Sequence, residues 1–483
     1  MDFSELHEKS VVIDTHNDAL SHLIDETTWL PKFNLKENLE NVTKYGHVDL
    51  DKLKRGSLNA AFFAICAPER FFPGKVLSRT LAMLNAIFMN IKDNSDSLEL
   101  IVAGTGELET VVKEKTKIAV VVTLEGIDSL DETRGIELLR QFDDLGIKVM
   151  GLTWNYSNQV AEGLNSVYSD GKTKASPPGL SPLGEKVVKE MNKLGIVIDV
   201  SHLHSRSFYH VLKISDVPVI ASHSGVKGVY EHRRNFSDEE LYALADKGGV
   251  IQINFASNFL SEIESEASVG RIVDHVEYAK NLVGRDHVGL GSDFDGTKVP
   301  PDLKDFSEYP KITREMMNRG FSDDEIEKIL GKNILKVMKE IEAKSSKEYK
   351  IDTAIDTAGT GKVDTGNFSL DQKVFGKKAT GIEIEPHFEM GTIFEDKDPL
   401  LGATINEYED KAREDKIKII MNGQVFTPDD IDSWSHPIFK KTSKAVYFKP
   451  PFLDQEFNVI TFSIHTELGK ELRATRIYHI KQN

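Results

Sequence analysis

The feature that most constrains the fold is an alternation of short apolar runs with longer amphipathic segments. The apolar runs are rich in Val, Ile, Ala and Phe and are nearly continuous, which is typical of strands buried on both faces of a parallel sheet. Eight runs have this character: 11–18, 58–66, 117–126, 147–155, 195–202, 218–224, 248–255 and 287–296.

The segments between these runs are long enough for helices and carry charged residues on one face. Clear examples are 135–144, 183–193, 238–247 and 271–282. Several of them end in a glycine directly before the next run, as helix C′ positions do (Gly146, Gly195 and Gly248). Eight strand–helix alternations in about 340 residues predict a single (β/α)8 barrel, with a doubly wound open sheet as the alternative.

Residues able to bind a metal stand at the carboxyl ends of five apolar runs. They are His16, Asp18, Glu125, His202, His223 and Asp293. Each histidine taken alone is explained as well by a polar residue that ends a strand. In a parallel barrel, however, these strand ends converge on one face, where active sites are built. His16 and Asp18 are also two residues apart on an extended backbone, so their side chains point to the same side.

The chain resembles the membrane dipeptidase (renal dipeptidase, peptidase M19) family of the amidohydrolase superfamily. The resemblance spans residues 11–337 and rests on short motifs whose order and placement are jointly specific. They are Ile13–Asp18, Leu124–Gly126, Leu152–Asn155, Asp199–His202, Ser222–Ser224, Arg233–Asn235, Gly291–Gly296 and Gly331–Asn333. This resemblance implies a binuclear zinc dipeptidase.

Carried over to this sequence, the resemblance implies that two Zn2+ ions share the Glu125 carboxylate. His16, Asp18 and Glu125 would bind the first ion, and Glu125, His202 and His223 the second. Asp293 matches the family's catalytic aspartate, and Arg234 matches the arginine that binds the substrate carboxylate. Trp154 departs from the pattern, because well-studied members have a histidine there; we expect Trp154 and Asn155 to contact the substrate instead.

The chemistry is consistent with this assignment. Two divalent ions about 3.5–4 Å apart lower the pKa of a shared water, so a bridging hydroxide can attack the peptide carbonyl. Asp293 can take up the proton and return it to the leaving amine. The planar guanidinium of Arg234 matches a free carboxylate in a two-point contact, which favours dipeptides over long peptides. The sequence carries no motif that selects particular side chains of the dipeptide or their L or D configuration.

The composition changes after residue 343. Residues 344–366 are polar and predict a linker, and 367–483 contain short alternating stretches with turn signals, which predict a small antiparallel β-sandwich. The last two stretches, 457–465 and 472–480, are expected to form a hairpin. We therefore divide the chain into a catalytic barrel, 1–343, a linker and a C-terminal β domain of unknown function.

Other classes fit less well. The formal net charge of −17 argues against a nucleic-acid surface. The amino terminus has no apolar signal segment and no run is long enough to span a membrane, so we expect a cytoplasmic protein. A homodimer is left open. The alternative functions are a lactonase or deaminase of the same superfamily, or a relative that binds a ligand without catalysis. Many such hydrolases use a carboxylated lysine on strand four, where Lys148 stands at the wrong end.

Overall fold

The structure is a computed structural model. It describes residues 2–40, 45–168, 178–346 and 349–351, and in the C-terminal region 382–386, 388, 390, 392–394, 401–407, 412–427, 439–440, 445–448, 456–466 and 471–480. Most of the predicted linker, 344–366, therefore lies outside the described residues. The boundaries proposed for the barrel and the β domain stay predictions.

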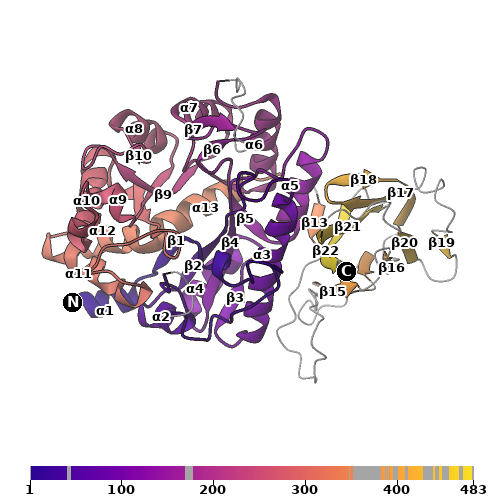
Figure 1. The fold of residues 1–483 in the computed structure, drawn as a ribbon, viewed down its shortest axis with the longest axis horizontal. Coiled ribbons are helices and arrows are strands. Elements are labelled where there is room, and N and C mark those ends of the chain that lie inside the picture. The colour runs from indigo at the N-terminus through magenta and orange to yellow at the C-terminus, as the bar shows by residue number, and fades with distance from the viewer. Residues whose placement is uncertain are drawn as a thin grey trace.

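Eight parallel strands form one sheet in the order β1-β2-β4-β5-β8-β9-β11-β12 (Figure 1). They are β1 (Ile13–Asn17), β2 (Ala60–Ile65), β4 (Ile118–Glu125), β5 (Ile147–Gly151), β8 (Val197–Asp199), β9 (Ile220–Val226), β11 (Val250–Ile253) and β12 (Val288–Leu290). The segment after β12 meets β1 through a bridge between Asn17 and Phe294 and through the Asp293 N–H, which donates to the His16 carbonyl at 3.0 Å. The sheet thus nearly closes on itself, as the predicted barrel does.

Helices surround this barrel (Figure 1). They include α3 (Val76–Asp93), α4 (Thr105–Glu114), α5 (Gly135–Asp144), α6 (Pro182–Leu194), α7 (Ser205–Ile214), α8 (Asp238–Asp246), α10 (Val269–Val283) and α13 (Asn333–Ala343). Shorter helices are α1 (Phe3–Lys9), α2 (Leu50–Arg55), α9 (Ser257–Leu260), α11 (Pro310–Asn318) and α12 (Asp323–Glu327). No helix in the described part of the chain has the length and apolarity that crossing a membrane requires.

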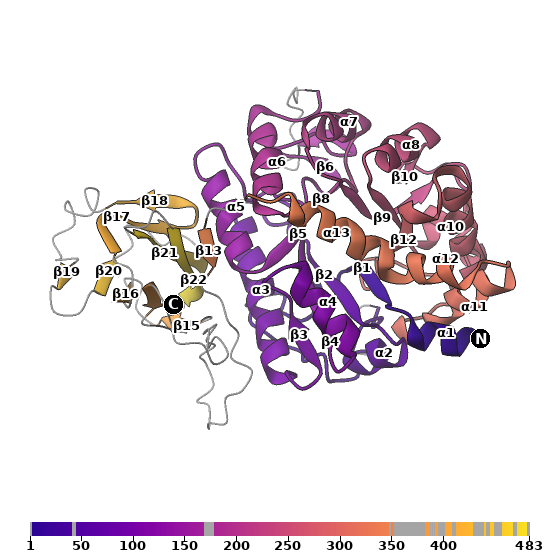
Figure 2. The same cartoon turned by 180° about the vertical axis from the view of Figure 1, so that it is seen from behind.

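One end of the barrel is closed by α13. Its residues Ile334, Val337 and Ile341 share a buried core with inward-facing side chains near the starts of the strands, such as Ile13 and Val121. Figure 2 shows α13 lying across the middle of the molecule, close to β1 and β5. Because apolar packing fills this end, a cavity can open only at the carboxyl ends of the strands, where the predicted site residues stand.

Beyond the barrel, two further sheets pack together. One has the order β13-β22-β21-β17-β18 with β15 also paired to β22, and the other has the order β14-β16-β20-β19. The strands are β13 (Tyr349–Ile351), β14 (Ile382–Pro386), β15 (Thr392–Phe394), β16 (Leu401–Glu407), β17 (Ala412–Met421), β18 (Gln424–Phe426), β19 (Phe439–Lys440), β20 (Ala445–Phe448), β21 (Phe457–Thr466) and β22 (Glu471–Ile480). Leu401 and Phe462, one from each sheet, belong to one apolar core, and β21 and β22 form the expected hairpin.

The C-terminal sheets lie against α3 and α5 of the barrel (Figure 1). The Gln141 amide donates to the Ile420 carbonyl at 3.0 Å, and its oxygen accepts from the Gly423 N–H at 2.7 Å. Nearby, the Asp144 carboxylate accepts from Arg473 Nε and from the Thr475 hydroxyl, each at 2.9 Å. Asp144 and Arg473 are 1% exposed. The β region is therefore attached to the barrel by buried polar contacts.

Breaking this buried ion pair should destabilise the protein. Arg473→Met removes the charged Nε donor that the buried Asp144 carboxylate accepts from, which we expect to cost about 3–5 kcal/mol. The exposed pair of Arg134 with Asp131 provides a matched control, because Arg134→Met should cost about 1 kcal/mol or less. Urea-unfolding midpoints of the two variants measure the difference. Equal midpoints would contradict a stabilising role for the buried contact.

Candidate metal centre and active site

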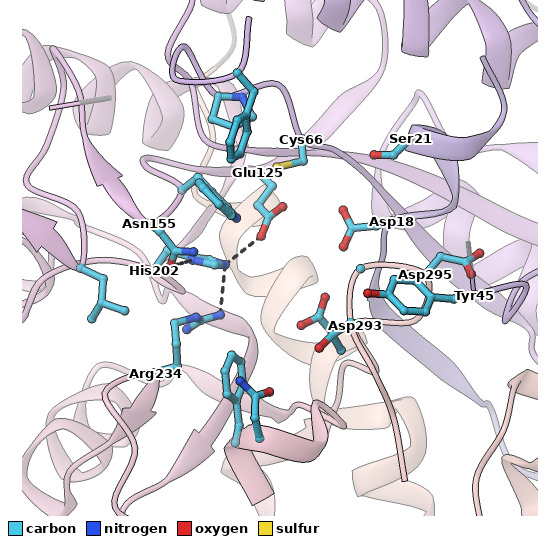
Figure 3. Close-up of a pocket in the computed structure, with 18 of the residues that line it drawn as sticks. Asp18, Ser21, Tyr45, Cys66, Glu125, Asn155, His202, Arg234, Asp293 and Asp295 are labelled. Carbon is cyan, nitrogen blue, oxygen red and sulfur yellow. Dashed lines mark hydrogen bonds and ion pairs between the residues drawn. The ribbon is translucent and has the colours of Figure 1, made fainter. Parts of the chain in front are cut away.

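A cavity of about 810 Å³ opens at the carboxyl ends of the barrel strands. Its wall contains Asp18, Glu125, His202, Arg234 and Asp293, which the sequence singled out from separate parts of the chain. Figure 3 shows Arg234, His202 and Glu125 on one side of this cavity and Asp18 and Asp293 on the other. Residues that are up to 275 positions apart, such as Asp18 and Asp293, thus face a shared space.

The backbone directs several of these side chains by leaving the strand abruptly. His202 and Asp293 each follow the end of a strand by three residues and have φ angles of +65° and +62°. This left-handed conformation is unfavourable for residues other than glycine and is typical of functional sites. His16 and Glu125 instead lie within β1 and at the end of β4, and His223 lies within β9.

Glu125 lies between the histidines. Its Oε1 atom is 2.8 Å from His202 Nε2, 3.4 Å from His223 Nε2 and 3.9 Å from His16 Nε2. The two ring nitrogens of His202 and His223 are themselves 2.8 Å apart. The rings of His16 and His223 are stacked with centroids 3.7 Å apart.

The hydrogen bonds of His223 fix where its proton stands. The Ser222 hydroxyl donates to Asp199 Oδ2 at 2.5 Å, so its oxygen accepts from His223 Nδ1 at 2.8 Å. With the proton on Nδ1, the neutral ring of His223 has a lone pair on Nε2.

The same holds for His202. Its Nδ1 atom faces the Asn155 amide oxygen at 2.9 Å and therefore donates, which leaves a lone pair on Nε2. Two nitrogen lone pairs and the Glu125 oxygen thus meet at one point. Such a set of acceptors calls for a cation between them, and the donor types are those that bind transition metals.

His16 provides a second indication. Its Nε2 atom is buried, has no hydrogen-bond partner among the residues that the structure describes, and lies 3.5 Å from Asp18 Oδ2. Two sets of side chains place their donor atoms within 4.8 Å of one another: His16 with Glu125 and His223, and His16 with Asp18 and Asp293. The residues therefore fit a metal centre.

Burial and charge prepare these groups for coordination. Burial, reinforced by the Arg234 cation, lowers the pKa of His202 to about 4, and burial lowers the pKa of His223 well below its usual value. Although burial alone would raise it, the adjacent His202 and His223 rings hold the pKa of Glu125 well below its usual value. At neutral pH the two imidazoles are neutral and the carboxylate is charged, as metal ligands must be.

The pKa of Asp293 shifts in the direction opposite to that of Glu125. Burial and the neighbouring Asp18 carboxylate raise the pKa of Asp293 to about 8. The Asn254 amide donates to its Oδ2 atom at 2.9 Å and fixes its orientation. A carboxyl group with a pKa near neutrality can both accept and donate a proton.

Arg234 is almost fully buried beside the histidines. Its Nη2 atom is 3.1 Å from His202 Nε2 and donates to the His223 carbonyl at 3.0 Å. Within the described part of the chain, its Nε atom has no hydrogen-bond partner. The guanidinium carbon lies 5.5 Å from the ring centre of Phe259. The side chain is thus held on one edge while another donor remains available to a ligand.

Trp154 and Asn155 both line the cavity, but they do different things. The Trp154 ring contacts Phe71, with centroids 5.7 Å apart, and lies 6.3 Å from the His202 ring. Asn155 orients His202, as described above. Trp154 therefore belongs to an aromatic wall, which also contains Tyr156.

Three supporting residues were missed by the sequence analysis: Asp199, Ser222 and Asn254. Asp199 and Ser222 stand within motifs that the sequence analysis quoted, so their place near strand ends was a usable signal. Asn254 has no such mark, because it follows β11 in an apolar run. Its role depends on a contact with Asp293 that no local pattern encodes.

Histidines and carboxylates gathered at the carboxyl ends of a parallel barrel define the class of metal-dependent barrel hydrolases. Comparisons with known proteins are consistent with this class. The family model described as membrane dipeptidase (peptidase family M19) matches residues 1–351. The chain therefore belongs to peptidase family M19 and is a metal-dependent dipeptidase.

Individual relatives support this family assignment. Dipeptidase verJ of Clonostachys rogersoniana is 32% identical over 349 residues, which cover 70% of this chain and 85% of that protein. An uncharacterized dipeptidase of Schizosaccharomyces pombe is 30% identical over 356 residues, covering 70% and 82%. The solved structure of dipeptidase AC, a metallo peptidase of family M19, is 25% identical, has a TM-score of 0.58, and covers 68% of this chain and 98% of that one.

Proposed function

We propose that the chain hydrolyses dipeptides with two Zn2+ ions that share the Glu125 carboxylate. His16, Asp18 and Glu125 would hold the first ion, and Glu125, His202 and His223 the second. The observation that carries this proposal is the meeting of the His202 and His223 lone pairs with the Glu125 oxygen, three acceptors within 3.4 Å of one another. A mixed imidazole and carboxylate set is the usual environment of catalytic zinc.

The proton transfers are assigned to Asp293. When bound, two divalent ions acidify water and polarise a carbonyl oxygen. Asp293 faces the same cavity from the Asp18 side, and Asn254 orients its carboxyl group. It can accept the proton of the attacking water and deliver it to the leaving amine. Asn155 and the Asp199–Ser222 pair would hold the His202 and His223 rings in place during these steps.

Arg234 would recognise the carboxylate at the C-terminus of the dipeptide. Its guanidinium is buried next to the histidines, so a charge-assisted contact there is not weakened by bulk water. A substrate bound by its terminal carboxylate must place the peptide bond at a fixed distance from Arg234. This requirement would select dipeptides, and the aromatic wall around Trp154 would contact their side chains.

The alternative of a lactonase or deaminase with a carboxylated lysine bridge is not favoured. Lys148 is the candidate lysine, and its ammonium pairs with Asp143 at 2.7 Å. It does not line the cavity. A bridging role for Glu125 needs no such lysine. The cytoplasmic location and the homodimer considered from the sequence stay predictions.

Removing Arg234 tests the proposed substrate class. We expect Arg234→Ala to lower kcat/KM for free dipeptides by roughly 2–5 kcal/mol, as loss of one partner of a buried charge pair does. The wild-type protein should cleave C-terminally amidated dipeptides poorly, and the variant should lose little further activity on them.

The neighbouring Arg233 supplies the control. Its side chain is exposed and bonds to the Leu164 carbonyl, so Arg233→Ala should have a much smaller effect on kcat/KM. Steady-state kinetics on paired free and amidated dipeptides test whether Arg234 binds the substrate carboxylate. Equal cleavage of the two forms by the wild-type enzyme would rule out carboxylate recognition and leave dipeptide hydrolysis itself intact.

A further inference from the structure

Besides Arg233 and Arg234, a third arginine lines the cavity. Arg79, at the start of α3, lines the same cavity as the metal centre and is 6% exposed. Its Nε and Nη1 atoms are buried without a hydrogen bond, and it forms no ion pair among the described residues. A buried cation without a partner is costly, so its position calls for an explanation.

The surroundings of Arg79 hold the guanidinium by its faces. Its central carbon lies 4.9 Å from the ring centre of Phe72 and 5.5 Å from that of Trp29. Stacking on aromatic faces fixes the plane of a guanidinium but does not engage the N–H groups at its edge. These N–H groups form a planar fork that matches a carboxylate. Arg79 is therefore oriented for an anion that the protein itself does not supply.

Arg79 and Arg234 stand on opposite sides of the barrel. Arg79 lies on the helix that follows β2, the second strand of the sheet, and Arg234 follows β9, the sixth. In a barrel of eight strands, the second and sixth strands face each other across the axis. A ligand that places a carboxylate at Arg234 and crosses the metal centre therefore extends toward Arg79.

We propose that Arg79 binds an acidic side chain on the N-terminal residue of the dipeptide, so that Glu-X and Asp-X dipeptides are preferred substrates. This inference rests on the proposed function, because it takes Arg234 as the site of the terminal carboxylate. The α-carboxylate of the substrate would then be bound by Arg234 on one side of the metals, and the side-chain carboxylate by Arg79 on the other. One carboxylate of the protein that could pair with Arg79 in place of the substrate is that of Glu26, an exposed residue that also lines the cavity.

Paired isosteric substrates provide the test. The ratio of kcat/KM for Glu-Ala over Gln-Ala compares a carboxylate with an amide of the same shape. In the zinc-loaded wild-type protein we expect this ratio to be on the order of 10–100, as for loss of a buried charged contact. In Arg79→Met the ratio should fall to near one. In Arg79→Lys, which retains the charge but not the planar fork, it should lie between these values.

Glu26→Gln is the matched control, and it should retain the wild-type ratio. A wild-type ratio near one would overturn the proposal without any variant. If that ratio then rose in Glu26→Gln, the charge of Arg79 would be assigned to Glu26. An equal loss of both substrates in Arg79→Met would also overturn it and assign Arg79 a structural role. Absence of hydrolysis of any dipeptide would instead refute the proposed function.

Discussion

Glu125→Gln should abolish metal binding and hydrolysis together. The Glu125 oxygen lies within 3.9 Å of Nε2 of all three histidines, and an amide in its place removes a negative charge from the centre. Loss of a residue that supports a ligand typically costs roughly 10–100-fold in affinity or activity, and loss of the shared ligand should exceed that. Elemental analysis of the purified variant and steady-state turnover measure the two effects.

Two control variants are compared with Glu125→Gln. Asp199→Asn alters the support of His223 through Ser222, while its amide oxygen can still accept from the Ser201 and Ser222 N–H groups. It should therefore reduce activity within the roughly 10–100-fold range while retaining both ions. Glu107→Gln alters a carboxylate in α4 that accepts from the Val102 and Ala103 N–H groups and does not line the cavity. It should retain metal and activity. Two ions per chain in Glu125→Gln would refute the shared-ligand assignment.

The barrel could be predicted from sequence because its strands are buried on both faces. Burial forces continuous apolar runs, and the amphipathic segments between them leave one arrangement for a parallel sheet. Helix α5 has the expected bounds, and α6, α8 and α10 differ by one or two residues. Strand β3 (Leu98–Leu100) was not expected, because three residues carry too little pattern; it pairs beside β4.

The site could be predicted only in part, for a related reason. His16 and His223 lie within β1 and β9 and Glu125 ends β4, and the barrel brings these strands together whatever lies between them in the sequence. The contact of Asn254 with Asp293 and that of Asn155 with His202 depend on side-chain directions that no short motif specifies. Asn155, for which we predict a substrate contact, lines the cavity and also orients the His202 ring.

The position of Arg79 in the cavity could not be predicted from the helical pattern of the sequence. In the sequence it stands near the start of an amphipathic segment, where a charged residue is ordinary. Its interest comes from the stacking against Phe72 and Trp29 and from the absence of a partner in the cavity, both tertiary facts. Helix periodicity cannot indicate whether a charged side chain faces water or a buried cavity.

Asp293→Asn should separate proton transfer from metal binding. If Asp293 carries the proton between the attacking water and the leaving amine, its amide variant should lose on the order of 10²–10⁴-fold in turnover. The Asn254 amide that now contacts Asp293 can still donate to the amide oxygen of the variant, so the local structure should persist. Both ions should therefore remain, as elemental analysis can establish.

Metal content and the choice of leaving group test whether Asp293 transfers a proton or binds a metal ion. Asp293 shares a cluster with His16 and Asp18, so loss of an ion in Asp293→Asn would assign it to metal binding instead. An amine must be protonated to leave, whereas an alkoxide needs this help less. The turnover loss should thus be smaller for the ester analogue of a dipeptide than for the dipeptide itself. Equal losses on the two substrates, with both ions retained, would remove Asp293 from leaving-group protonation.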